Sequence, residues 1–138
     1  MPRRALRSLP AVVSGIAVLA TAPAAPAALV SFQTPSRNIG CIGDATYLRC
    51  DVRTTTAPIP PRPRSCDLDW GDAFGMAPRS RSRRICHGDT ALGAGPVLRY
   101  GRSRRIGPFR CVSQTAGLTC RNRAGHGWFL SRQRVSLK

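Results

Sequence analysis

Six cysteines constrain this chain more than any other feature, because four of them fall in two identical frames. CIGDATYLRC occupies residues 41–50, and CVSQTAGLTC occupies residues 111–120. Each frame is a cysteine, eight residues and a second cysteine, and the remaining two are Cys66 and Cys86. Zinc ligands usually come in pairs about two to four residues apart, so this spacing disfavours a metal site. The sequence therefore predicts three disulfides, no metal and no cofactor.

Alternation of side chains along a strand indicates which cysteines pair, although the count alone allows about 15 pairings. If Cys41 faces Cys50 across a hairpin, the neighbouring apolar residues fall on the face that carries the cysteines. Arg49 and Asp51 then fall on the opposite face. The cysteine-bearing face carries Ile39, Cys41, Leu48, Cys50 and Val52. This clean separation favours a hairpin closed by its own disulfide.

The second frame gives the same result. If Cys111 faces Cys120, the polar residues Arg110, Thr119 and Arg121 share the outer face. The inner face then carries Phe109, Cys111, Leu118 and Cys120. A slip of one residue would move every side chain to the wrong face, so the pattern supports this register. By elimination, Cys66 pairs with Cys86.

The rest of the sequence favours short strands separated by turns, since Gly, Pro, Asn and Asp interrupt short apolar runs. The predicted strands are Thr46–Val52, Cys66–Trp70, Val97–Tyr100, Phe109–Ser113, Gly117–Asn122 and Gly127–Ser131. No window of a dozen residues shows a helical period. We therefore expect an all-β, disulfide-stabilised single domain of short antiparallel strands and hairpins, with little or no helix.

Residues 1–27 resemble a secretory signal peptide. Its basic start consists of Arg3, Arg4 and Arg7. Leu9–Ala22 is uncharged and rich in Val, Leu and Ile, and a small-residue cleavage site ends at Ala27. A retained anchor is the alternative, but the compact apolar part is shorter than the roughly 20 residues of a spanning helix. The expected product is one secreted or cell-envelope domain, residues 28–138, with no membrane span and a monomeric state.

The formal net charge is +16, because 22 Lys and Arg stand against 6 acidic residues, and Lys138 is the single lysine. Such a charge predicts an anionic polymer as partner. Base composition of a GC-rich genome is the alternative cause of so many arginines. The densest charge run is RSRSRR at residues 79–84, and a second run follows Gly101. The candidate anion-binding residues are Arg79, Arg81, Arg83, Arg84, Arg102, Arg104 and Arg105.

Two histidines are candidates for a polar site. His87 stands two residues before Asp89, and His126 lies between two glycines. A histidine oriented by a carboxylate can act as a general base, so His87, Asp89 and His126 could serve a small nuclease-like hydrolase. The alternative is that each imidazole is satisfied by the backbone of a turn. No nucleophile elbow or metal-ligand cluster appears in the sequence, so we assign no catalytic residue.

The segment TTTAPIPPRPR at residues 54–64 contains four prolines and predicts an extended connector. It is either a stiff loop between the first hairpin and Cys66, or a segment presented to a target protein.

Several motifs together resemble a family of small secreted actinobacterial proteins whose domain has no assigned function. They are PSRNIGC, RCD, DWG, GDT, YG, C-x8-C-RN and GHGWFLSR. Trp128 departs from the pattern, since a GHGFF-type motif would place phenylalanine there. The resemblance implies export, disulfides and one compact domain, and it supplies no catalytic residues.

Taken together, the sequence favours a secreted, non-catalytic binding domain whose ligand is an anionic envelope polymer or an extracellular protein. A small secreted hydrolase that uses His126 or His87 with Asp89 is the second interpretation. A secreted inhibitor or effector that presents residues 54–64 is the third.

Overall fold

The structure, a computed structural model, describes residues 1–2, 8–25 and 28–138. The described residues form strands and no helix, which confirms the all-β prediction. The strands are β1 (Val30–Gln33), β2 (Ile39–Gly43), β3 (Leu48–Val52), β4 (Ala73–Met76), β5 (Arg83–Arg84), β6 (Ser103–Ile106), β7 (Phe109–Gln114), β8 (Gly117–Arg121), β9 (Gly127–Leu130) and β10 (Val135–Leu137). The first five form one antiparallel sheet in the order β1-β2-β3-β4-β5, and the last five form a second in the order β10-β9-β8-β7-β6.

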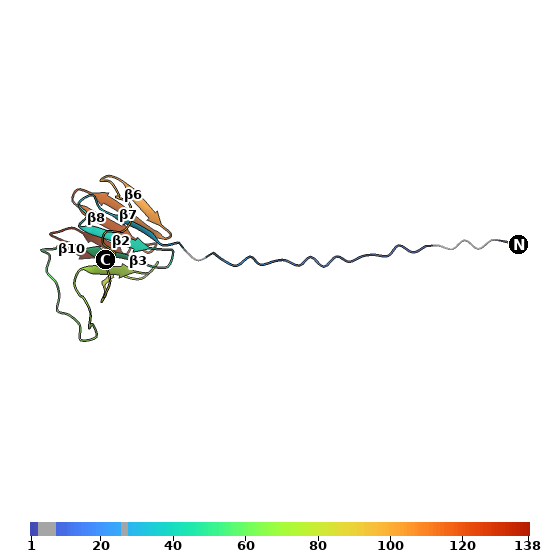
Figure 1. The fold of residues 1–138 in the computed structure, drawn as a ribbon, viewed down its shortest axis with the longest axis horizontal. Helices are drawn as coiled ribbons and strands as arrows, with labels where there is room; N and C mark the ends of the chain where they lie inside the picture. Colours follow the sequence, from blue (N-terminus) through green and yellow to red (C-terminus); the bar gives the residue numbers. More distant parts are fainter. Residues whose placement is uncertain (3–7, 26–27) are drawn as a thin grey trace.

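The two sheets pack against each other and share one hydrophobic core, so the domain is a β-sandwich (Figure 1). Both sheets contribute large apolar side chains that are fully buried. Phe74 on β4 and Trp128 on β9 meet in this core with ring centroids 6.5 Å apart. The apolar residues therefore fill the space between the sheets, and each sheet has one face left over.

Both predicted hairpin registers are confirmed. Cys41 is opposite Cys50 in the β2–β3 hairpin, and Cys111 is opposite Cys120 in the β7–β8 hairpin. The three disulfides join the expected pairs, including the pair formed by Cys66 and Cys86. The four hairpin cysteines are completely buried, since their faces turn towards the core. These disulfides are consistent with an extracellular protein.

The two hairpin disulfides occupy equivalent positions and face each other across the core. In the first sheet the residue beside Cys50 on the next strand is Phe74, and in the second sheet Trp128 stands beside Cys120. The Sγ atoms of Cys41, Cys50 and Cys120 lie within 4.8 Å of one another. Because all three sulfurs are in disulfides, they offer no thiolate to a metal ion.

Two predicted strands are wrong. Residues 66–70 are mostly exposed, and only Asp69 forms an isolated bridge, with His87. Residues 97–100 likewise contribute one bridge, between Val97 and Gln33. Neither segment has a neighbouring strand along its length. Conversely, the sequence does not predict the arginine-rich β5 and β6, since their residues have poor strand propensity. These strands form because they pair with β4 and β7.

Trp128 contains a buried polar atom without a partner. Its side chain is completely buried, and its indole Nε1 makes no hydrogen bond within the described part of the chain. A phenylalanine, which the resemblance leads one to expect here, would have no such N–H group to satisfy. The ring therefore contributes packing against Phe74 and beside Cys120, and no polar contact among the described residues.

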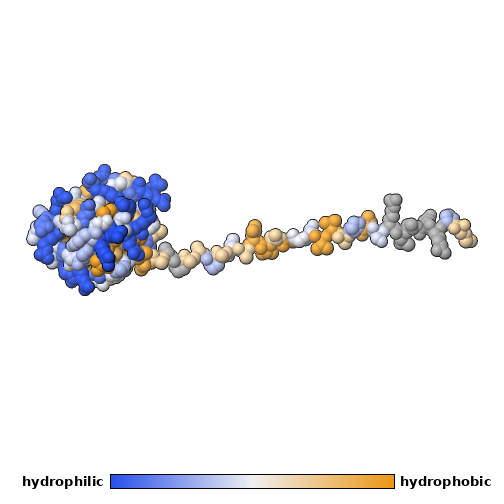
Figure 2. Space-filling model, turned by 90° about the horizontal axis from the view of Figure 1, so that it is seen from above, coloured by the Kyte–Doolittle hydropathy of each residue, from blue (hydrophilic) through white to orange (hydrophobic). Residues whose placement is uncertain are grey.

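Residues 8–25 have no regular secondary structure and extend away from the sandwich (Figure 1). Their apolar side chains, such as Val12 and Ile16, are almost fully exposed, in contrast to the hydrophilic surface of the sandwich (Figure 2). The predicted basic start, Arg3, Arg4 and Arg7, and the predicted cleavage residues Pro26 and Ala27 lie outside the described residues. None of the described residues belongs to a helix with the length and hydropathy needed to cross a membrane.

Candidate functional site

The outer face of the first sheet is covered by other parts of the chain. Asp51 lies on this face as predicted, yet it is only 1% exposed, because its Oδ2 accepts a hydrogen bond from the backbone N–H of Ala91 at 2.8 Å. A Cβ built on Gly40 would lie 2.5 Å from the carbonyl oxygen of Ala91, and one on Gly75 would overlap the hydroxyl of Tyr47. Glycine at these two positions therefore allows the cover to approach closely.

Arg49, also on this outer face, is fully engaged. Its Nε and Nη2 donate to the two carboxylate oxygens of Asp51, both at 2.8 Å, which is a bidentate pair. Nη2 also donates to the backbone carbonyl of Asp89 at 2.8 Å. The hydrogen bond from Arg49 to the Asp89 carboxylate holds the pKa of Asp89 below its usual value. Arg49 therefore fixes the cover and is not available to an external anion.

The outer face of the second sheet is open and carries three arginines in one row. Arg105 on β6 pairs with Arg110 on β7, and Arg110 pairs with Arg121 on β8. Directly opposed residues in antiparallel strands point to the same side of the sheet, so the three guanidinium groups are neighbours. Arg105 and Arg110 are exposed, and Arg121 is half-buried. We call Arg105, Arg110 and Arg121 the arginine ladder.

No carboxylate neutralises the arginine ladder within the part of the chain that the structure describes. The ion pairs found there involve Arg49 and His87 only. All six acidic residues precede residue 90 in the sequence, so the second sheet has none. Like charges placed opposite each other destabilise a sheet, and this arrangement is therefore a cost to the fold.

A second row of side chains lies beside the ladder on the same face. It consists of Val112, Thr119, Phe129 and Ser136. The guanidinium carbon of Arg134 lies 4.4 Å from the centre of the Phe129 ring, which is a cation–π contact. Arg121 donates a hydrogen bond only to the carbonyl of Cys120, at 3.5 Å. The open face thus combines arginines that have no ion-pair partner among the described residues with a row of apolar and hydroxyl side chains.

The predicted RSRSRR run divides into free and engaged residues. Arg79, Arg81 and Arg83 are exposed. Arg84 is structural: its Nε donates to the carbonyl of Gly71 at 3.1 Å, and its guanidinium carbon lies 5.2 Å from the Phe74 ring centre. Burial lowers the pKa of Arg84.

The second predicted run is split by strand alternation. Arg104 shares a face with Cys111 and is half-buried at the sheet edge, whereas Arg105 points outwards into the ladder. Arg102 precedes the strand in a turn, where its N–H donates to the carbonyl of Arg99. The alternation of side chains along the second hairpin predicts Arg110 and Arg121 on one outer face, but it does not predict that Arg105 lies in line with them. The tight Gly-Pro turn between β6 and β7 was the signal that could have located it.

His87 is bound by two partners. Its Nε2 lies 2.7 Å from a carboxylate oxygen of Asp72, and its Nδ1 lies 2.7 Å from the backbone carbonyl of Asp89. The side chain of Asp89 instead contacts Arg49. Burial alone would lower the pKa of His87, but the hydrogen bonds to Asp72 and Asp89 outweigh it and raise the pKa. The imidazole therefore joins loops of the first sheet and has no free ring nitrogen.

We expect the protein to be more stable at pH 5.5 than at pH 8.5 because of His87. The unfolded histidine titrates at about pH 6.5, and the folded pKa is higher, so this contribution is complete below pH 6.5. It is lost as pH rises through the folded pKa. Thermal unfolding followed by circular dichroism should show this trend, and His87→Gln should reduce it. An unchanged pH dependence in that variant would assign the effect to other groups.

His126 lies in the turn between β8 and β9, in the other half of the sandwich. Its backbone N–H donates to the side-chain oxygen of Asn122, and its carbonyl accepts from the backbone of the same residue. No hydrogen bond or ion pair among the described residues joins its imidazole to His87 or to a carboxylate. The two candidate histidines therefore do not share a site. The imidazole of His87 and the carboxylate of Asp89 bind different partners, Asp72 and Arg49, and His126 belongs to a separate turn.

The proline segment is exposed from Pro58 to Ser65 and projects from the sandwich as the green loop in Figure 1. Its backbone is nevertheless fixed at several points. The indole Nε1 of Trp70 donates to the carbonyl of Pro60 at 3.0 Å, and the N–H of Thr56 donates to the carbonyl of Arg132 at 2.7 Å. The segment is therefore a stiff and accessible loop.

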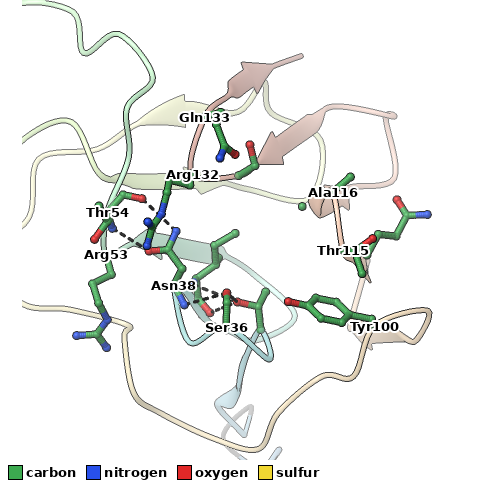
Figure 3. A pocket seen from close by; sticks show the side chains of 14 residues that line it. Ser36, Asn38, Arg53, Thr54, Tyr100, Thr115, Ala116, Arg132 and Gln133 are labelled. Carbon is green, nitrogen blue, oxygen red and sulfur yellow. Dashed lines mark hydrogen bonds between the residues drawn. The ribbon is translucent and has the colours of Figure 1, made fainter.

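A polar pocket of about 410 Å³ lies at one end of the sandwich (Figure 3). It is formed by the β1–β2 turn, the residues after β3, the loop containing Tyr100, and the β7–β8 and β9–β10 turns. The sequence gives no sign of this end pocket, because its residues come from five separate segments. No periodic pattern links them.

Comparison with known proteins assigns the chain to a family but does not assign it an activity. No curated protein and no solved structure matches the chain. The family described as "Family of unknown function (DUF6636)" matches residues 11–138, which is nearly the whole sequence. The chain therefore belongs to the DUF6636 family.

Proposed function

We propose that this protein is a secreted, non-catalytic binding domain for a linear anionic polymer at the cell envelope or outside the cell. The arginine ladder is its contact surface. The observation that carries the proposal is the row formed by Arg105, Arg110 and Arg121. None of the three has an ion-pair partner among the described residues, and they lie on adjacent strands of a sheet without acidic residues. The signal-like segment before residue 28 and the three disulfides support an extracellular site of action.

The geometry of the ladder favours a repeating anion over a single small one. Neighbouring strands are about 4.8 Å apart, so three guanidinium groups span roughly 10 Å across the sheet. Guanidinium groups bind phosphate or carboxylate in a bidentate manner. A polymer with closely spaced anionic groups could engage all three at once, whereas a single anion would leave repulsion among the others.

The contrast between the two sheets also supports a binding role. The row in the first sheet that corresponds to Arg110 and Arg121 consists of Gly40 and Asp51, which the chain itself covers through Ala91. The second sheet has no cover of this kind among the described residues. The exposed row of the second sheet instead carries arginines whose mutual repulsion destabilises the sheet. This arrangement is expected if an external anion offsets the repulsion.

The triple variant R105Q/R110Q/R121Q should bind labelled polyphosphate much more weakly than the unchanged protein. Polyphosphate is a suitable probe because it contains neither sugar nor carboxylate. Each arginine that neutralises a phosphate releases about one counterion from the polymer, so each lost contact reduces the number of released ions by about one. The slope of log affinity against log salt concentration should therefore become shallower by about 2 to 3. Fluorescence anisotropy over a series of salt concentrations measures both quantities.

The matched control is R79Q/R81Q/R83Q, which removes the same charge from the exposed residues of the RSRSRR run predicted from sequence. This variant should lose much less affinity and slope. Equal losses in the two variants would show that net charge, not the ladder, determines binding. Larger losses in the control would move the site to the RSRSRR run.

A further inference from the structure

We infer that the end pocket is a binding site for an acidic sugar, in which Arg132 binds the carboxylate and Tyr100 supports the sugar ring. This site is separate from the arginine ladder, and the inference does not depend on the proposed polymer binding. It rests on the size of the pocket, its charge, its unused polar groups and the fixed geometry of its rim.

The pocket has the size and construction of a ligand site. Its volume of about 410 Å³ lies within the range of about 300 to 1,000 Å³ that small-molecule sites occupy. Turns from both sheets meet at this end of the sandwich, including the two-residue turn around Thr115 and the β9–β10 turn around Gln133. Such loop clusters on a rigid β scaffold commonly carry binding sites.

The charge of the lining selects an anionic ligand. Two arginines, Arg53 and Arg132, contribute to the wall, and none of the lining residues is acidic. The guanidinium of Arg132 makes no hydrogen bond or ion pair among the described residues, while Arg53 contacts only the carbonyl of Arg37. A carboxylate entering the pocket would thus find cations that no group of the protein neutralises.

The remaining lining favours a ligand rich in hydroxyl groups. The side chains of Gln114, Thr115 and Gln133 form no hydrogen bonds within the described part of the chain, so their donors and acceptors are free. Tyr100 is 46% exposed, and Figure 3 shows its ring extending across the pocket with the hydroxyl towards Ser36. An aromatic ring beside amides and hydroxyls suits a sugar, which has an apolar ring face and polar edges.

The rim of the pocket is held in one conformation. The side chain of Asn38 donates to the carbonyl of Thr54 and accepts from its N–H, both at 3.0 Å. Between Ser36 and Asn38, Arg37 adopts a φ of 57°, the one positive φ of a non-glycine residue in the described chain. Backbone held in this uncommon region is typical of ligand sites. The pocket is therefore preorganised.

The test is a titration of the disulfide-bonded, ¹⁵N-labelled protein with D-glucuronate, followed by amide chemical shifts. Shifts should concentrate on Thr115, Gln133 and the neighbouring turns. Arg132→Gln should weaken glucuronate affinity by about tenfold, the loss expected for one charge-assisted contact. Tyr100→Ala should weaken it further than Tyr100→Phe, because the ring and not the hydroxyl supports the sugar.

Glucose and acetate are the reference ligands. Each supplies half of the proposed chemistry, so both should bind more weakly than glucuronate. Arg62→Gln, which removes an exposed arginine of the proline loop, should leave glucuronate affinity unchanged, and so should R105Q/R110Q/R121Q. Equal binding of acetate would reduce the pocket to a simple anion site, and equal binding of glucose would remove the role of Arg132. Absence of shifts with glucuronate would also overturn the inference.

Discussion

Replacing Cys111 and Cys120 together by alanine should lower the free energy of unfolding by about 3 to 5 kcal/mol. A loop of this length alone accounts for about 2.7 kcal/mol through the entropy of the unfolded chain. The rest comes from packing, because both cysteines are completely buried and Cys120 lies beside Trp128. Removing their sulfurs leaves a cavity that the surrounding rigid sheet cannot fill. Chemical denaturation with a fluorescence readout measures the change.

The Cys66–Cys86 disulfide provides the comparison. It closes a longer loop, with a sequence separation of 20 rather than 9, so chain entropy alone would make it the more important bridge. Cys86 is exposed, however, and Cys66, although buried, lies outside the core cluster between the sheets, so their loss opens no cavity there. We therefore expect C66A/C86A to destabilise the protein less than C111A/C120A. The reverse order would mean that loop entropy dominates and that core packing around the sulfurs contributes little.

Asp51→Ala should destabilise the protein by about 3 to 5 kcal/mol, the usual cost of removing one partner of a buried ion pair. The carboxylate accepts hydrogen bonds from Arg49, Ala91 and Thr90, and it is 1% exposed. Its loss would leave the guanidinium of Arg49, whose side chain is 14% exposed, without its principal partner. Thermal and denaturant unfolding of the variant measure the effect.

Asp89→Asn is the matched control, since Asp89 also contacts Arg49 but its side chain is 83% exposed. Exposed ion pairs contribute little to stability, so this variant should unfold nearly like the unchanged protein. A similar loss in both variants would indicate that the exposed carboxylate of Asp89 holds Arg49 as firmly as the buried carboxylate of Asp51. A small loss for Asp51→Ala would show that the cover can leave without disturbing the sheet.

The sequence was sufficient for the two cysteine hairpins and for β9, and insufficient for β4 and for the four edge strands. The two cysteine frames fix register because a shift by one residue would expose Leu48 or Leu118 and bury a charge. Strands β5 and β6 are short and arginine-rich, so their pairing depends on neighbours distant from any local pattern. Edge strands therefore escaped prediction for a physical reason, since tertiary hydrogen bonds override weak propensity.

The candidate sites show the same division. Alternation correctly placed Arg110 and Arg121 outside, because it depends only on the register of one hairpin. The burial of Asp51 could not be foreseen, since Ala91 reaches it from 40 residues away. The end pocket was equally hidden, because long-range packing brings Tyr100 beside turns of both sheets.

The contact between the two hairpin disulfides has a consequence for oxidative folding. The sulfurs of Cys50 and Cys120 come from different sheets yet lie within 4.8 Å of each other. When the first hairpin is reduced, a thiolate on Cys50 that attacks Sγ of Cys120 would form a Cys50–Cys120 bridge between the sheets and release Cys111 as a thiolate. Because packed sheets lie about 10 Å apart, such a bridge would draw the two backbones together and distort the sandwich. Native pairing is therefore favoured when each hairpin closes its own disulfide before the two sheets pack. The short loop of each hairpin promotes this order.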